Sequence, residues 1–160
     1  MTYVLGRASL AELEGVHPQI VAVVRAAIQI TTQDFSVHDG LRTAAEQAEY
    51  VRRGVSKTMA SKHMRQADGY GHAVDLVPYI NGQLRWEWKP IYQIARAVRV
   101  AAAERGVKLI WGGVWDRDFE KLEPTASGLE IAVQNYTARR RAAGKSAFID
   151  GPHFELRGAA

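Results

Sequence analysis

Histidine and aspartate residues gather in two parts of this chain that lie far apart along it. The middle contains Ser61-Lys62-His63 and Gly71-His72-Ala73-Val74-Asp75, and the C-terminal end contains Asp150-Gly151-Pro152-His153-Phe154-Glu155. Two imidazoles and a carboxylate are a ligand set of catalytic zinc sites, which leave one coordination position for water. A further carboxylate would serve as the proton acceptor that such a site needs. A fold that uses these residues together must bring the middle of the chain against its end.

The composition narrows both the class of protein and the ligand chemistry. The 160 residues are 47% apolar, which suits a single packed domain over residues 1–160. Because the chain has no cysteine, disulfides and thiolate zinc sites are excluded, and histidine and carboxylate remain as ligands. The sequence has no apolar run long enough to cross a membrane and no signal-peptide pattern. We therefore expect a protein made in soluble form in the cytoplasm, without membrane insertion.

Strand alternation decides which histidines are the better ligand candidates. Residues 73–77 read as a strand, on which Asp75 shares a face with apolar residues, a costly position unless the carboxylate is paired or binds a metal. His153 and Glu155 share a face of the last strand. His72 lies three residues before Asp75, so the two side chains would point to opposite faces, which favours His63 as the remaining ligand. If His63, Asp75 and His153 converge, the chain is a zinc hydrolase; His72 stays the alternative to His63.

The local pattern predicts an α+β fold with a small antiparallel sheet flanked by helices. Capping boxes at Ser9 and Thr43 predict helix starts, Pro18 and Pro90 predict two more, and Gly54, Gly106 and Gly144 predict helix ends. Residues 54–72 have no clean period and predict a long functional loop. The expected strands are residues 34–38, residues 73–77 ending at Pro78 and residues 107–111, with short extended pieces at residues 148–150 and 153–156. Asn81-Gly82 predicts a hairpin-type turn.

The basic charge of the chain is modest. The formal net charge is +4, and Arg139, Arg140 and Arg141 form its densest cluster. Such a cluster favours anionic polymers, or simply forms a solvated helix face. This charge is small for a nucleic-acid binder, so we do not expect nucleic acid as a partner. Among the tryptophans, Trp115 lies in a glycine-rich loop and is the best candidate to line a substrate cleft.

Seven short motifs occur in an order that resembles a known family. They are Gly40-Leu41-Arg42-Thr43, Glu46-Gln47, Gly54-x-Ser56, Ser61-x-His63, Gly71-x-Ala73-x-Asp75, Trp111-Gly112-Gly113-x-Trp115 and Asp150-x-Pro152-His153-Phe154. Over residues 16–156 the chain resembles the zinc peptidases grouped with D-alanyl-D-alanine carboxypeptidases and phage L-alanyl-D-glutamate endopeptidases. The resemblance implies the Hedgehog/DD-peptidase-like fold, one Zn²⁺ and bacterial peptidoglycan stem peptides as substrate.

The resemblance also assigns roles to individual residues. It implies that His63, Asp75 and His153 are zinc ligands and that Asp150 is the catalytic base. Arg42 and Ser61 are expected to support the site; the Arg42 guanidinium would bind a substrate carboxylate or stabilise an oxyanion, or would form an ordinary salt bridge.

The chain departs from the family pattern in two places. His63 and Asp75 are twelve residues apart, a longer separation than is common in the family, which indicates an insertion within residues 64–70. A helix containing the three arginines also comes between the tryptophan loop and the last histidine.

The resulting hypothesis is a monomeric phage endolysin. It would be held in the host cytoplasm before release and would act on the cell wall as an L-alanyl-D-glutamate endopeptidase. The alternatives are a D-alanyl-D-alanine carboxypeptidase and a non-catalytic wall-binding module; the spare carboxylate of Asp150 argues against the second.

Overall fold

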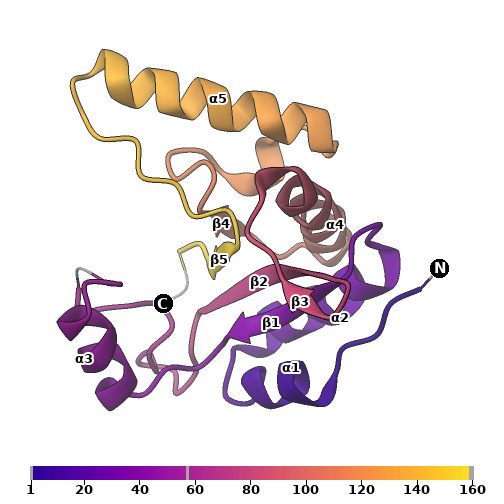
Figure 1. Ribbon diagram of the computed structural model, residues 1–160, viewed down its shortest axis with the longest axis vertical. Helices are drawn as coiled ribbons and strands as arrows, with labels where there is room; N and C mark the ends of the chain where they lie inside the picture. The colour runs from indigo at the N-terminus through magenta and orange to yellow at the C-terminus, as the bar shows by residue number, and fades with distance from the viewer. Residues whose placement is uncertain (1, 57, 159–160) are drawn as a thin grey trace.

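A small antiparallel sheet forms the centre of the protein in a computed structural model that describes residues 2–56 and 58–158 (Figure 1). The strand order is β1-β2-β5-β4, and β3 pairs with β2. The helices and strands are α1 (Arg7–Glu12), α2 (Pro18–Ile30), β1 (Phe35–Asp39), α3 (Ala44–Arg52), β2 (Ala73–Ile80), β3 (Gln83–Leu84), α4 (Trp88–Arg105), β4 (Leu109–Trp111), a 3₁₀ turn (Phe119–Lys121), α5 (Ala126–Ala142) and β5 (His153–Leu156). The expected α+β class is confirmed.

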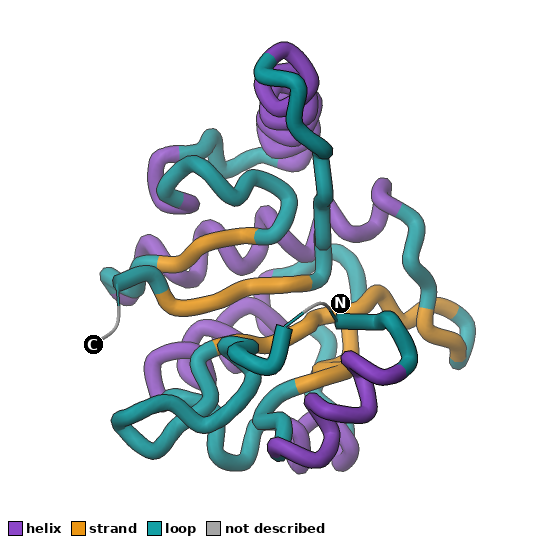
Figure 2. The backbone as a smooth tube through the Cα atoms, turned by 90° about the vertical axis from the view of Figure 1, so that its left-hand side faces the viewer, coloured by secondary structure: helices purple, strands orange, loops and turns teal. Residues whose placement is uncertain are grey.

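The two faces of the sheet have different surroundings. Val74 and Leu76 of β2 and Phe154 and Leu156 of β5 belong to the buried core, which α2 and α4 also contribute to. These helices pack against each other, and α5 packs on α4. Figure 2 shows the strands across the middle of the molecule, with α5 seen along its axis at the top. The residues that alternate with the core positions therefore face the opposite side, where the candidate ligands lie.

Several predicted helix and turn signals are confirmed. Thr43 forms a complete capping box with Glu46 at the start of α3. Gly106 ends α4 in the left-handed region at φ 64°. Asn81 and Gly82 both have positive φ and connect β2 to β3 in the predicted turn. Within the described residues, none of the helices is both long enough and apolar enough to cross a membrane.

Two local predictions are wrong for identifiable reasons. Ser9 does not begin a helix, because α1 starts at Arg7; the Ser9 hydroxyl instead accepts a hydrogen bond from Val37 N at 3.0 Å and ties α1 to β1. Pro78 does not end β2, because the carbonyl of Pro78 still accepts a hydrogen bond, from Arg85 N at 2.8 Å. The extended piece expected at residues 148–150 forms no strand, and residues 153–156 form β5.

A candidate metal centre in the cleft

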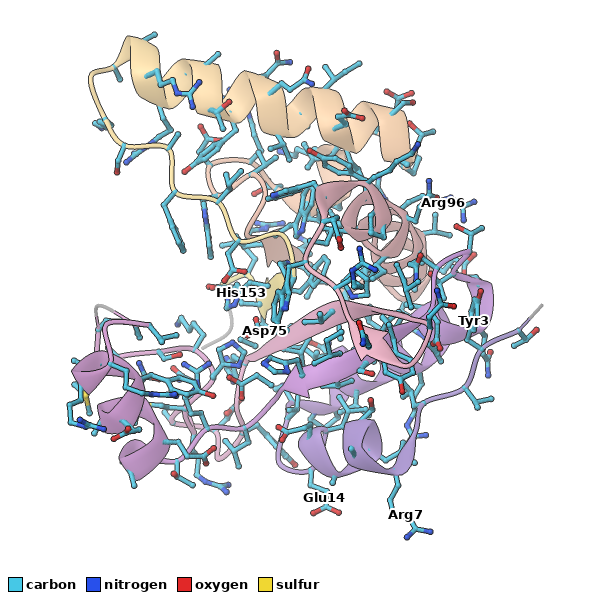
Figure 3. The ribbon with its side chains drawn as sticks, in the orientation of Figure 1. Tyr3, Arg7, Glu14, Asp75, Arg96 and His153 are labelled. Carbon is cyan, nitrogen blue, oxygen red and sulfur yellow. The ribbon has the colours of Figure 1, made fainter. Side chains whose placement is uncertain are left out.

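A cavity of about 660 Å³ lies over the open face of β2 and β5. One wall comes from residues 54–56 and 58–63, which follow α3, and the other from Trp115, Phe148 and Asp150. Figure 3 shows Asp75 and His153 close together where these two strands meet, between α3 and the segment that returns from α5. The predicted functional loop therefore forms a wall of the cleft.

The side chains of His63, Asp75 and His153 converge on the floor of this cavity. One ligand atom from each residue lies within 4.8 Å of the other two. Asp75 and His153 are direct partners in the antiparallel pairing of β2 and β5. The same oxygen, Asp75 Oδ1, lies 3.3 Å from His63 Nε2 and 3.2 Å from His153 Nδ1. The middle and the end of the chain are thus brought together as the sequence required.

The imidazole of His63 is oriented by the backbone of a neighbouring turn. Its Nδ1 lies 2.9 Å from the carbonyl oxygen of Gly40, which can only accept, so Nδ1 carries the proton and Nε2 faces Asp75. A Cβ at Gly40 would lie 1.8 Å from the carbonyl oxygen of Glu12, so only glycine fits at this position. The glycine of the first motif therefore allows the turn that orients His63.

The imidazole of His153 is oriented by a carboxylate that holds Nε2, whereas the partner of His63 holds Nδ1. Its Nε2 lies 2.8 Å from Glu155 Oε1, and its Nδ1 faces Asp75. Burial alone would lower the pKa of His153, but its hydrogen bonds to Asp75 and Glu155 outweigh that effect and raise the pKa to about 10. Burial would likewise raise the pKa of Asp75, but the imidazoles of His153 and His63 hold it far below its usual range. Asp75 is therefore ionised at neutral pH.

These surroundings fit a zinc ion. The donor set is two imidazole nitrogens and a carboxylate oxygen, which zinc accepts in catalytic sites. Each histidine has its second ring nitrogen held by an acceptor, Gly40 O or Glu155, as is usual for metal-binding histidines. The three side chains are largely buried, with exposed fractions of 4% for His63, 10% for His153 and 18% for Asp75.

Asp150 lines the same cleft and is positioned by its backbone and by the tryptophan motif. Asp150 N donates to Gly112 O at 2.8 Å, and Gly112 N donates to His153 O at 2.9 Å. Trp111, fully buried, donates from Nε1 to Gly151 O at 2.7 Å. Burial and the nearby charge of Asp75 raise the pKa of Asp150 above its usual range. A carboxyl group with a raised pKa next to a metal centre is suited to both accepting and donating a proton.

Arg42 and Ser61 are placed as supporting groups around His63. The Arg42 guanidinium donates to Asp39 through Nε, at 3.1 Å, and through Nη2, and donates to Gln47 Oε1 through Nη1 at 2.7 Å. Its backbone N donates to His63 O at 2.8 Å. The Ser61 hydroxyl accepts from His63 N at 3.1 Å. Both residues also line the cleft.

His72 points away from the candidate ligands. Its ring is 2% exposed and its Nε2 lies 2.7 Å from Asp68 Oδ2. The ring of His17 lies beside it, with centroids 5.4 Å apart. β2 begins at Ala73, but the carbonyl oxygen of His72 still accepts a hydrogen bond from Leu156 N of β5 at 3.0 Å, so the alternation expected of a strand that includes His72 extends to this residue.

Aromatic side chains form the wall opposite the loop. Trp115 stacks on Phe148, with ring centroids 6.2 Å apart, and lies 5.3 Å from the ring of His153. Trp115 was expected in the cleft, whereas Phe148 and the ring-orienting role of Glu155 were not. Phe148 is 67% exposed and lies in an irregular segment, so the local sequence gave no periodic signal for it.

Two of the three adjacent arginines make structural contacts rather than a free basic patch. Arg139 Nη2 lies 2.6 Å from Asp116 Oδ1, next to Trp115, and Arg140 Nε donates to Ser146 O at 2.8 Å. These bonds tie the end of α5 to both segments of the aromatic wall. The extra helix noticed in the sequence therefore supports one side of the cleft.

Comparisons with known proteins agree with this geometry. The model of a family described as phage L-alanyl-D-glutamate peptidase matches residues 1–157. The chain is similar to the L-alanyl-D-glutamate peptidase of Escherichia phage T5, with 32% identity over 120 residues that cover 72% of this chain and 84% of that protein. It is also similar to the crystal structure of the Serratia marcescens L-Ala D-Glu endopeptidase ChiX, with 37% identity, a TM-score of 0.67, and coverage of 96% of this chain and 90% of that one.

Proposed function

This chain belongs to the phage L-alanyl-D-glutamate peptidase family, and from that premise we propose that it is a zinc-dependent endolysin that hydrolyses the bond between L-alanine and D-glutamate in peptidoglycan. The observation that carries the proposal is the convergence of His63, Asp75 and His153 in one cleft with Asp150 beside them. A wall-binding module would need no further carboxyl group beside these three residues.

His63 would bind zinc through Nε2, His153 through Nδ1 and Asp75 through a carboxylate oxygen. This choice of ring nitrogens follows from the partners of the other two, Gly40 O and Glu155. When bound, zinc supplies Lewis-acid chemistry: it lowers the pKa of water to about 7 and polarises a carbonyl group.

Asp150 would move the protons of the reaction. Its carboxylate would accept a proton from the attacking water and return that proton to the nitrogen of the departing D-glutamate. The raised pKa of Asp150 favours the protonated carboxyl that the second step requires. Because Gly112 binds the backbone of Asp150 and not its carboxylate, the side chain remains available for this transfer.

Arg42 and Ser61 would position the reacting groups. Three of the five guanidinium N–H groups of Arg42 are committed to Asp39 and Gln47, which leaves at most two for the carbonyl oxygen of the scissile bond. Asp39 compensates the charge of Arg42, so this pair suits a developing oxyanion better than a free carboxylate. Ser61 would hold the backbone of His63 in place.

The proposal is tested by digesting purified peptidoglycan and identifying the new termini by mass spectrometry. We expect new alanine carboxyl and glutamate amino termini, loss of both after chelation, and recovery when zinc is added. His63→Ala provides the matched inactive control. Release of terminal D-alanine alone would establish a carboxypeptidase, and wall binding without new termini would establish a binding module.

A further inference from the structure

The substrate carries a negative charge next to the scissile bond, and this inference rests on the function proposed above. Glutamate has one amino group and two carboxyl groups. Its amino group forms the bond to alanine, and at most one carboxyl group can continue the peptide. At least one carboxylate therefore remains close to the departing nitrogen, unless it is amidated. A cleft that selects this substrate needs a positive charge on the departing side.

The charges that line the cleft leave one clear candidate for this role. Among the described residues that line it, Arg42 and Lys62 are the lysine and arginine side chains. Arg42 is 8% exposed and forms a buried ion pair with Asp39. The other ion pairs of the cleft join His63 and His153 to Asp75, and His153 to Glu155. In the described parts of the chain, the Lys62 ammonium group has no carboxylate partner comparable to the Asp39 partner of Arg42. Among the described residues that line the cleft, Lys62 thus carries the positive charge that no ion pair compensates.

The backbone of Lys62 is fixed while its side chain is free. The carbonyl oxygen of Lys62 accepts from His72 N at 2.8 Å, and the neighbouring His63 is held by Ser61 and Gly40. The side chain of Lys62 is exposed and lines the cavity next to His63. An ammonium group on a flexible stem can follow a carboxylate without rigid geometry. The aromatic wall of Trp115 and Phe148 provides no such charge.

We propose that Lys62 is a specificity-determining residue that binds the free carboxylate of the D-glutamate residue at the cleavage site. Removing this charge should weaken binding of the anionic substrate and leave the chemical step unchanged, because the ion pair is made equally in the bound substrate and in the transition state. An amidated glutamate would not benefit from Lys62, so the lysine sets a preference between carboxylate and amide forms.

The test uses two synthetic stem peptides that differ only in this group, one with the free glutamate carboxylate and one with a primary amide. We expect the zinc-loaded parent enzyme to prefer the carboxylate peptide by about tenfold in kcat/KM. That ratio corresponds to a free energy between that of an exposed ion pair and that of a hydrogen bond to a charged group. Lys62→Met should raise KM for the carboxylate peptide about tenfold, keep kcat within about twofold, and abolish the preference. Lys62→Arg should retain most of it.

The control is Lys108→Met, which removes the same charge from an exposed residue before β4 that does not line the cleft. It should keep the full preference. Equal preference in Lys62→Met and the parent, or no preference in the parent, would overturn the role of Lys62 while leaving the peptidase intact. Failure of the parent to cleave either peptide would instead refute the proposed function, and the role of Lys62 with it. Zinc content and melting temperature establish that each variant is folded and loaded.

Discussion

Replacing Asp150 by asparagine separates its catalytic role from its effect on stability. The substitution keeps the shape of the side chain and the backbone hydrogen bond from Asp150 N to Gly112 O, so the fold and the zinc ligands should remain. A general base contributes about 10²–10⁴-fold to the rate, or roughly 2.7–5.5 kcal/mol at about 1.36 kcal/mol per decade. We therefore expect Asp150→Asn to bind zinc as the parent does and to lose about 10²–10⁴-fold in turnover of a stem peptide.

The same substitution should stabilise the protein after zinc is removed with a chelator. Burial, reinforced by the charge of Asp75, raises the pKa of Asp150, so folding penalises its ionised form. This loss of stability develops as the pH rises from the pKa of Asp150 in the unfolded chain, about 3.9, through its pKa in the folded protein, and it persists at higher pH. Asp150→Asn should therefore melt at a higher temperature than the parent at pH 7, and the difference should shrink toward pH 4. Turnover within tenfold of the parent would refute the base role; a lower melting temperature at pH 7 would refute the argument from burial.

Three further sets of substitutions test the surroundings of the site. His63→Ala should lose zinc and activity, whereas His72→Ala should keep most of its zinc by metal analysis; the reverse result would make His72 the ligand. Arg42→Lys keeps a charge beside Asp39 but loses the hydrogen bond to Gln47. The melting temperature should therefore fall by several degrees, corresponding to about 1–2 kcal/mol of stability, while kcat should fall by less than about tenfold. A larger loss of kcat would indicate that Arg42 contacts the reacting carbonyl directly. Arg139 lowers the pKa of Asp116, so this ion pair stabilises the fold at pH values above the pKa that Asp116 has in the unfolded chain. The stabilisation is lost as the pH falls through the pKa that Asp116 has in the folded protein. Asp116→Arg and Arg139→Asp should each lower the melting temperature at pH 7, and the double variant should restore it; additive losses would show that the two residues are not coupled.

The parts of the fold that the sequence predicted are those governed by local chemistry. The Thr43 capping box and the Asn81-Gly82 turn depend on a few adjacent residues, and both occur as expected. Ser9 fails because its hydroxyl has a partner far along the chain, Val37 N, that competes with the local cap. The prediction that β2 ends at Pro78 is wrong because proline lacks only the backbone N–H, and the sheet uses its carbonyl oxygen, which accepts from Arg85 N.

The candidate site was predictable to the extent that alternation sets the direction of side chains. Asp75 and His153 lie on β2 and β5 and face the cleft as their strand positions required. Two neighbours of the ligands were harder to predict from the sequence. Gly40 orients His63 through a carbonyl oxygen, which every residue has, and Phe148, which stacks on Trp115, comes from an irregular segment. Their importance arises from three-dimensional proximity, which no short-range pattern encodes.

The unusual separation of His63 and Asp75 shows why distance along the chain is a poor guide to this site. The intervening segment forms a closed turn. In it, Arg65 and Gly71 form an isolated antiparallel β-bridge, and Gln66 N donates to Tyr70 O at 2.8 Å. Gly71 then docks on the residues before α2, and its carbonyl oxygen accepts from His17 N at 2.9 Å. The additional residues therefore leave and return at nearly the same place, and lengthening a closed loop costs little free energy. As a result, His63 Nε2 still lies 3.3 Å from Asp75 Oδ1, and His72 is directed to Asp68 within the turn instead.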